Sequence, residues 1–271
     1  MHCASEPAIA SRPGASRPGP PVLRWTTRVL FALALAANAG LAGAAEITVS
    51  AAASLTNALR EIGTAFEAAH PGTTLQFNFA ASGALLQQIA QGAPVDVFAS
   101  ADQETMDQAE QQKLIRAGTR ANFAGNSLVV IVPVDRPPAR SLADLAGATV
   151  RQVAIGVPAS VPVGRYTKAV LEKAGLWPQI EAKMIGAHTA RQVLDYVARG
   201  EVDAGFVYGT DAALMPDKVK VALTVPTATP VLYPIAPLAA SPNAALAARF
   251  VEFAASAPAQ AVLAKYGFGK P

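Results

Sequence analysis

Short apolar runs rich in β-branched residues alternate with amphipathic segments of helical period along most of this 271-residue chain. The runs expected to form strands are residues 47–50, 75–79, 95–98, 127–133, 153–157, 183–185 and 204–208. The segments expected to form helices are residues 54–69, 82–90, 102–114, 163–174, 189–199, 243–255 and 259–266. Such alternation is typical of α/β proteins, because each helix returns the chain so that the next strand can join the sheet in parallel. We therefore expect mainly parallel sheets flanked by helices.

The alternation is interrupted at two places, which we interpret as crossings between two lobes. The apolar run 127–133 is a long buried strand that leads into a second lobe, and the proline-rich stretch 225–237 is expected to be extended. This predicts a first lobe of residues 46–126 and 238–271 and a second lobe of residues 127–237. Two crossings form a hinge, and the cleft between lobes is where an α/β protein usually binds its ligand.

Residues 1–45 have the pattern of a signal peptide with an N-terminal extension. Arg24 and Arg28 precede the apolar run 29–37, and residues 42–44 offer a small-residue cleavage site. The apolar run is too short to span a membrane permanently. We therefore expect export into the periplasm, with the folded protein beginning near Glu46.

Charge and cysteine content exclude several functions for the exported part. The chain has 22 Lys and Arg and 19 Asp and Glu, of which the leader holds four basic residues and one acidic residue, so 18 of each sign remain. A formally neutral protein gives little support to nucleic-acid binding. The single cysteine, Cys3, lies in the leader. A disulfide, a thiolate nucleophile and a cysteine-ligated metal are therefore excluded for the remainder.

Two serines stand where a predicted strand passes into a predicted helix. Ser54 follows the small-residue turn after strand 47–50, and Ser82 lies between strand 75–79 and helix 82–90. We expect both at helix N-termini, with Ser54 as an N-cap. The leading N–H groups of a helix have no internal acceptor and the macrodipole is positive there, so an adjacent hydroxyl helps to hold an anion. A single such serine is most often only a cap, but two of them indicate one anion site.

The second predicted lobe repeats this arrangement. Val163 and Ala190 each lie at the start of a predicted helix that follows a strand, and they would present backbone N–H groups to the cleft. Tyr208 ends another strand, where its phenol can donate one hydrogen bond. Four helix N-termini, each worth roughly +0.5 charge, could balance a dianion without a lysine or arginine. Such a site also avoids the cost of burying an unpaired cation.

An enzyme is the main alternative class. A hydrolase with Ser54 as its nucleophile needs a base within hydrogen-bond distance, and the exported part offers two histidines, His70 and His188, outside any zinc-binding spacing. A P-loop, a G-x-G-x-x-G fingerprint and a G-x-S-x-G elbow are absent from the sequence. The ligand-sensing domain of a regulator is a third alternative, opposed by the export signal. We therefore expect a binding protein rather than an enzyme.

Five stretches resemble a known family in their order and spacing. They read AAASLTN (51–57), GAPVDVFASADQ (92–103), GNSLVV (125–130), VYGTDA (207–212) and YGF (266–268). They resemble the periplasmic molybdate-binding proteins that serve ABC transporters, and the resemblance extends from Glu46 to the C-terminus. It implies a two-lobed periplasmic-binding-protein fold that closes on one tetrahedral oxyanion.

The resemblance also implies a set of ligand contacts. Carried over residue by residue, they are the hydroxyl and N–H groups of Ser54 and Ser82, the N–H groups of Val163 and Ala190, and the hydroxyl of Tyr208. The metal would be held as its oxyanion, without direct ligation. Some relatives have a serine at the position of Gly83 and a smaller residue at that of Val163.

The function implied is the binding of molybdate, and of tungstate because it is nearly the same size, with delivery to the membrane permease of an ABC importer. Sulfate or another tetrahedral oxyanion is the alternative ligand within the same fold. We expect a monomer with no cofactor and no nucleic-acid partner.

Overall fold

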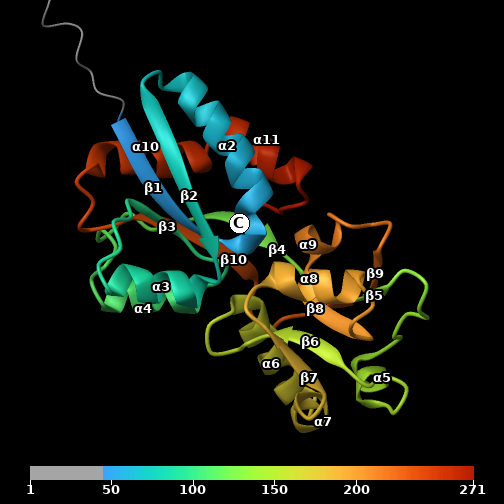
Figure 1. Cartoon of the computed structure of the whole chain (residues 1–271). Coiled ribbons are helices and arrows are strands. Elements are labelled where there is room, and N and C mark those ends of the chain that lie inside the picture. Colours follow the sequence, from blue (N-terminus) through green and yellow to red (C-terminus); the bar gives the residue numbers. More distant parts are fainter. Residues whose placement is uncertain (1–44) are drawn as a thin grey trace, which may run out of the picture. The chain divides into compact units, whose positions relative to one another are not determined.

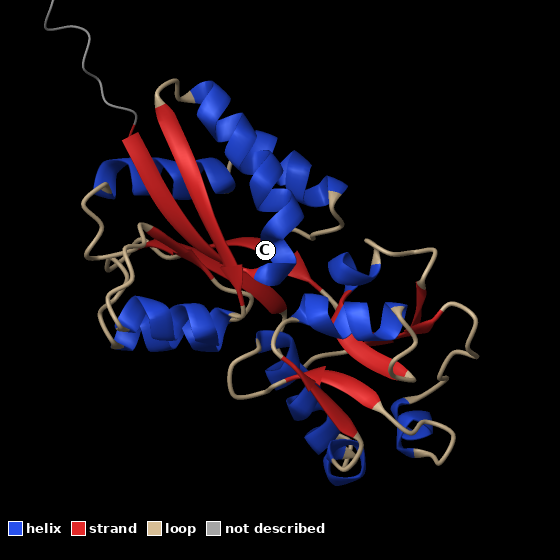
Figure 2. Ribbon diagram, viewed as in Figure 1, coloured by secondary structure: helices blue, strands red, loops and turns tan. Residues whose placement is uncertain are grey.

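The structure, a computed structural model, describes residues 45–271 as two five-stranded sheets with helices packed on them (Figures 1 and 2). The predicted leader lies outside the described residues apart from Ala45, where the first strand begins. Within the described part, no helix is long and apolar enough to cross a membrane.

The first sheet combines strands from both ends of the described chain. Its strand order is β2 (Thr73–Ala80), β1 (Ala45–Ala52), β3 (Val97–Ala99), β10 (Val231–Pro237) and β4 (Ala121–Asn126). Its helices are the 3-10 turn η1 (Ala53–Leu55), α2 (Thr56–Ala69), α3 (Ser82–Ala90), α4 (Gln103–Gln111), α10 (Ala244–Ala254) and α11 (Ala257–Lys265). β1 is parallel to β2 and β3, whereas β10 is antiparallel to β3 and β4.

The second sheet is built in the same way from the middle of the chain. Its strand order is β7 (Met184–Ala187), β6 (Val153–Gly156), β8 (Ala204–Tyr208), β5 (Leu128–Pro133) and β9 (Val219–Val225). Its helices are α5 (Leu142–Ala146), α6 (Pro162–Lys173), α7 (Trp177–Glu181), α8 (Ala190–Ala198) and α9 (Gly209–Ala212). β6 is parallel to β7 and β8, whereas β5 is antiparallel to β8 and β9.

The alternation of side chains along the strands explains how helices cover both faces of each sheet. In β3, Val97 and Ala99 belong to the core that includes α2 and α10, whereas Phe98 between them packs with α3 and α4. In β8, Val207 packs with α8, and Tyr208 faces the core that includes α6. Figure 1 shows α3 and α4 on one side of the first sheet and α2 and α10 on the other.

The α/β class is confirmed, but the sheets are mixed rather than mainly parallel. Each sheet has two parallel and two antiparallel strand pairs. All four antiparallel pairs involve strands next to the crossings, namely β10 paired with β3 and β4, and β5 paired with β8 and β9. A strand that enters a lobe from the other lobe has no crossover helix to reverse its direction, so it can join antiparallel.

The position of β10 corrects the predicted return crossing. Residues 231–237 were expected in the second lobe, but they form a strand between β3 and β4 of the first sheet. The stretch is extended as expected, and the chain crosses back between Val225 and Val231. Pro234 fits within the sheet because the pairing of β10 with β4 shifts register between Tyr233 and Pro234.

Gly164 allows the first turn of α6 to lie directly against the end of β6. A Cβ at this position would be 1.8 Å from the carbonyl oxygen of Gly156, which belongs to the backbone of β6 and cannot move aside. The N-terminus of α6 is therefore fixed relative to the second sheet by the absence of a side chain.

We expect Gly164→Ala to lower the free energy of unfolding by about 3 kcal/mol, because overpacking against backbone outweighs the gain of about 1 kcal/mol in helix propensity. Thermal unfolding followed by circular dichroism would measure this as a midpoint lowered by roughly 6–12 °C. Lys173→Ala, at an exposed position of the same helix, is the matched control and should change the free energy by less than about 0.5 kcal/mol. Equal midpoints for the two variants would contradict the proposed close approach.

Candidate functional site

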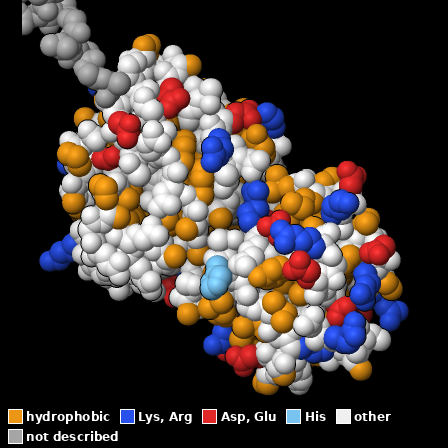
Figure 3. Space-filling model, in the orientation of Figure 1, with side chains coloured by type: hydrophobic (Ala, Val, Ile, Leu, Met, Phe, Trp, Pro, Cys, Tyr) orange, Lys and Arg blue, Asp and Glu red, His pale blue; other side chains and the backbone are white. Residues whose placement is uncertain are grey.

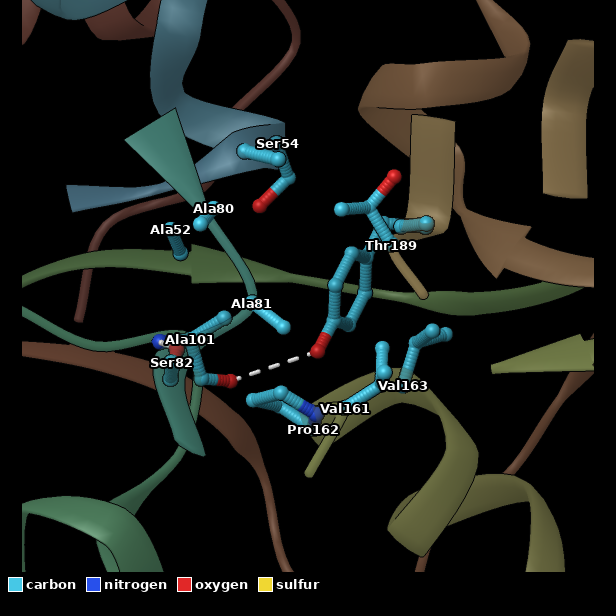
Figure 4. A pocket seen from close by; sticks show the side chains of 13 residues that line it. Ala52, Ser54, Ala80, Ala81, Ser82, Ala101, Val161, Pro162, Val163 and Thr189 are labelled. Atoms are coloured by element: carbon cyan, nitrogen blue, oxygen red, sulfur yellow. Dashed lines mark hydrogen bonds between the residues drawn. The ribbon is translucent and has the colours of Figure 1, made fainter. Parts of the chain in front are cut away.

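All five residues singled out from the sequence line one cavity at the carboxyl ends of strands from both sheets (Figure 4). Its lining consists of Ala52, Ala53, Ser54, Ala80, Ala81, Ser82, Ala101, Val161, Pro162, Val163, Thr189, Ala190 and Tyr208. The volume open to the centre of a water-sized sphere is about 10 Å³, which is about the room of one water molecule, so the cavity is narrow in this conformation. The many alanines allow the backbone itself to form the wall.

Ser54 lies in the 3-10 turn between β1 and α2, so its predicted role as an N-cap is wrong. The N-cap of α2 is Leu55, and no side chain caps this helix. The Ser54 side chain is 5 % exposed, and its Oγ lies 3.1 Å from the hydroxyl oxygen of Tyr233. The sequence could not distinguish a 3-10 turn from the first turn of the helix, because both begin at the same junction.

Ser82 is the first residue of α3, after the N-cap Ala81. Its side chain is fully buried, and its Oγ accepts a hydrogen bond of 3.0 Å from the N–H of Ala101. The expected position at a helix start is confirmed, although the hydroxyl bonds to a neighbouring loop instead of capping its own helix.

Val163 and Ala190 bring backbone N–H groups from the starts of α6 and α8. Among the hydrogen bonds between described residues, neither N–H group is a donor, and the same holds for the N–H groups of Ser54 and Ser82. Thr189 caps α8 by accepting from the N–H of Gln192 at 3.1 Å, which leaves the Ala190 N–H free. The cavity therefore has backbone donors without protein acceptors on several sides.

Tyr208 ends β8, and its hydroxyl donates to the carbonyl oxygen of Ala101 at 3.3 Å, the bond dashed in Figure 4. The peptide groups of Ala101 thus contact Ser82 through the N–H and Tyr208 through the carbonyl oxygen. Burial raises the pKa of the Tyr208 phenol well above its ordinary value, so the hydroxyl keeps its proton and remains a donor.

No charged side chain is among the described residues that line the cavity. Two arginines stand nearby, and each is paired with an aspartate. Arg165 of α6 donates to Asp102, the N-cap of α4, at 2.7 Å, and Arg191 of α8 donates to Asp211 at 2.7 Å. Burial raises the pKa of the Asp211 carboxyl, and the charge of Arg191 opposes this rise. The pairing leaves the surroundings of the cavity with little net charge.

The two sheets approach each other closely beside the cavity. The N–H of Gly83 donates to the carbonyl oxygen of Ser160 at 3.0 Å, and a Cβ on Gly83 would come within 2.7 Å of that oxygen. Arg191 also reaches from α8 to Asn57 of α2, at 3.1 Å. The glycine at position 83 therefore permits this contact.

Within residues 45–271, neither serine of the cavity contacts a basic side chain. The Oγ atoms of Ser54 and Ser82 contact a phenol and a peptide N–H, not a base. His70 bonds to the carbonyl oxygen of Phe66 and stacks on its ring, and His188 is exposed. In the part of the chain that the structure describes, no three His, Cys, Asp or Glu side chains are grouped to hold a metal ion.

Two polar residues behind the cavity were not identified from the sequence. Tyr233 is fully buried in β10 and contacts Ser54, and Asn126 at the end of β4 contacts Tyr233. Asn126 belongs to the stretch GNSLVV, which was recognised only as a family signature. Tyr233 gave no signal because its strand was assigned to the wrong lobe.

Residues 47–269 match the family described as bacterial extracellular solute-binding protein. The chain is 38 % identical over 248 residues to the molybdate-binding protein ModA of Escherichia coli, with 88 % of this chain and 94 % of that protein covered. The Azotobacter vinelandii periplasmic molybdate-binding protein superposes with a TM-score of 0.71 at 24 % identity, over 83 % of this chain and 99 % of that one. The sulfate-binding protein SubI of Mycobacterium tuberculosis shares the fold, with a TM-score of 0.73 at 19 % identity over 83 % and 87 % of the two chains. The chain belongs to the bacterial extracellular solute-binding proteins.

Proposed function

We propose that this protein binds molybdate, and also tungstate, in the cavity between its two sheets and delivers the oxyanion to an ABC importer. The observation that carries the proposal is the convergence of hydroxyl and N–H donors on one small cavity that no charged side chain lines in the described residues. The molybdate-binding relative from Escherichia coli, similar over nearly its whole length, supports the choice of ligand.

The donors suit an anion that only accepts hydrogen bonds. Molybdate is fully deprotonated at neutral pH, whereas phosphate keeps a proton that needs an acceptor. The carbonyl oxygen of Ala101 is an acceptor beside the cavity, and in this structure it receives the Tyr208 hydroxyl. Sulfate matches molybdate in charge and shape and is smaller, so the size of the cavity must separate the two.

Each proposed contact has a defined role. Ser54 and Ser82 donate through hydroxyl and N–H groups, Val163 and Ala190 donate through N–H groups, and Tyr208 donates through its hydroxyl after turning away from Ala101. The helix starts that carry Ser82, Val163 and Ala190 add favourable dipoles, each worth roughly half a charge. The metal stays within its oxyanion, without direct ligation, and no cofactor takes part.

The working cycle follows from a site with walls on both sheets. An open form captures the oxyanion, the lobes close by bending at the two crossings, and the closed surface is recognised by the membrane permease. The protein acts as a monomer in the periplasm after export by its leader. On the face shown in Figure 3, acidic and basic side chains are interspersed over the second sheet, and this face offers no broad basic surface for nucleic acid.

A ligand panel tests the function directly. We expect molybdate and tungstate to raise the thermal midpoint, because a ligand at 1,000 times its Kd stabilises the folded state by about 4 kcal/mol. Sulfate and phosphate at equal concentration and ionic strength should leave the midpoint unchanged. Stabilisation by sulfate alone would favour the sulfate alternative, and no response to any of the four anions would refute oxyanion binding.

Ser54→Ala should weaken molybdate binding by about 1.5–3 kcal/mol, which is roughly 10- to 150-fold in Kd, because it removes a hydrogen bond to a charged group. Titration calorimetry measures the change. Thr64→Ala is the control, since it removes a hydroxyl from the exposed face of the adjoining helix and should leave Kd unchanged. An unaltered Kd in Ser54→Ala would remove Ser54 from the site.

Molybdate affinity should stay constant from about pH 7 to pH 9. Burial raises the pKa of Tyr208, so its phenol keeps the proton throughout this range, and the other proposed donors do not titrate. The neighbouring Arg165 and Arg191 are paired with Asp102 and Asp211. Calorimetric titrations at several pH values would check this, and a steady loss of affinity towards pH 9 would indicate a titrating donor at the site.

A further inference from the structure

A series of hydrogen bonds connects Ser54 to residues that do not line the cavity. The Tyr233 hydroxyl oxygen lies 3.1 Å from the Ser54 Oγ and 3.1 Å from the Asn126 Nδ2, and the Tyr233 side chain is fully buried. Asn126 also contacts Thr210, at 2.9 Å. Tyr233, Asn126 and Thr210 do not line the cavity, so they do not touch a ligand there.

The orientation of the Asn126 amide determines which atoms donate and which accept in these hydrogen bonds. Its Oδ1 accepts the N–H of Ser127 at 2.9 Å, which requires the amide oxygen on that side and the NH₂ group on the other. The two amide hydrogens then go to the Thr210 Oγ1 and the Tyr233 hydroxyl. Because both amide hydrogens are donors, the Tyr233 hydroxyl oxygen must accept from Asn126.

Tyr233 then has its own proton left to donate. Among the described residues, its remaining hydrogen-bond partner is the Ser54 Oγ. A phenol whose pKa burial raises well above its ordinary value keeps that proton. Since two protons cannot share the space between the oxygens, the Ser54 proton must turn elsewhere, and the cavity is where its hydroxyl faces.

Ser82 is held in the same way by a different partner. The peptide N–H of Ala101 donates to its Oγ at 3.0 Å, in a fully buried position. A peptide N–H cannot accept, so the Ser82 proton also has to point away from this bond. On this assignment, both serine hydroxyls of the cavity accept a hydrogen bond from the protein.

We propose that Tyr233, oriented by Asn126, is a positioning residue that fixes the Ser54 hydroxyl as a donor to the ligand and thereby selects oxyanions that carry no proton. The inference rests on the proposed function. With the Tyr233 proton on one lone pair of its Oγ, Ser54 can present the other lone pair to a P–OH group only by turning its own proton to a side where the described residues offer no acceptor. A hydrogenphosphate ion would therefore be rejected by orientation as well as by size.

The first test is Tyr233→Phe, which keeps the ring and removes the donor. Molybdate Kd should rise about threefold to tenfold, because Ser54 loses its fixed orientation. The ratio of hydrogenphosphate Kd to molybdate Kd, with phosphate measured near pH 8, should fall by a similar factor. Tyr266→Phe, which removes a phenol bonded to Glu61 away from the cavity, is the control and should change neither value.

A double-mutant cycle separates positioning from general support of the fold. If Tyr233 acts through Ser54, Tyr233→Phe should change Kd by less than about twofold in a Ser54→Ala background. A loss of the same size in both backgrounds, or an unchanged phosphate-to-molybdate ratio, would overturn the inference. Wild-type protein that fails to bind molybdate would instead refute the proposed function, so the two failures are distinguishable.

Asn126→Asp is a second variant, which reverses the direction of the hydrogen bonds from residue 126 through Tyr233 to Ser54. A carboxylate accepts the Tyr233 proton, so the phenol then accepts from Ser54 and the serine presents a lone pair to the cavity. Molybdate binding should weaken more in this variant than in an Asn126→Asp, Tyr233→Phe double variant. The double variant has the same added charge but lacks the hydroxyl that connects residue 126 to Ser54. A double variant that binds as weakly as Asn126→Asp alone would show that charge repulsion is the whole effect, and would also overturn the inference.

Discussion

A small dianion can be removed from water only if donors surround it, and those donors must not leave an unpaired charge behind when the anion departs. This constraint accounts for the form of the cavity. The described lining residues include no charged side chain, and the free N–H groups of Ser54, Ser82, Val163 and Ala190 belong to the backbone. Backbone donors cannot be supplied by a flexible surface residue. They require helices and turns that begin at the same point, so the topology of both sheets is tied to the requirements of one ligand.

The sheets satisfy this requirement by placing strand ends next to each other. β1, β2 and β3 of the first sheet and β6, β7 and β8 of the second end beside the cavity. The turns or helices that follow these strands supply its lining. Close approach then depends on small residues. Gly164 brings α6 onto β6, and Gly83 allows a hydrogen bond to Ser160 between the two sheets. These glycines touch no ligand in the proposed site, yet they determine where its donors lie.

The sequence was informative where a local rule acts and uninformative where long-range pairing decides. Helix starts after strands are local features, so Ser82, Val163 and Ala190 could be placed from their neighbours in the chain. The 3-10 turn at Ser54 was missed because it differs from a helix start only in one hydrogen bond. The lobe of β10 was predicted wrongly because its partners, β3 and β4, lie more than 100 residues earlier in the chain. Tyr233 was not identified because its strand was assigned to the other lobe. Its proposed role depends on contacts with Asn126 and Ser54, which lie far from it in the sequence.

The contacts between the two sheets suggest how binding and closure are coupled. They include a backbone hydrogen bond from Gly83 to Ser160, the hydrogen bond from the Tyr208 phenol to Ala101, and the pairing of Arg165 with Asp102. Neutral hydrogen bonds contribute about 1 kcal/mol each, and the Coulomb attraction in the largely buried pair of Arg165 and Asp102 is offset by the cost of removing both charges from water. Closure without ligand is therefore only weakly favoured, and the differential contacts of the oxyanion with both lobes decide the equilibrium. In the proposed site Tyr208 takes part in both states, since its single proton goes to Ala101 or to the ligand. The same phenol thus links the closed conformation to the presence of an acceptor in the cavity.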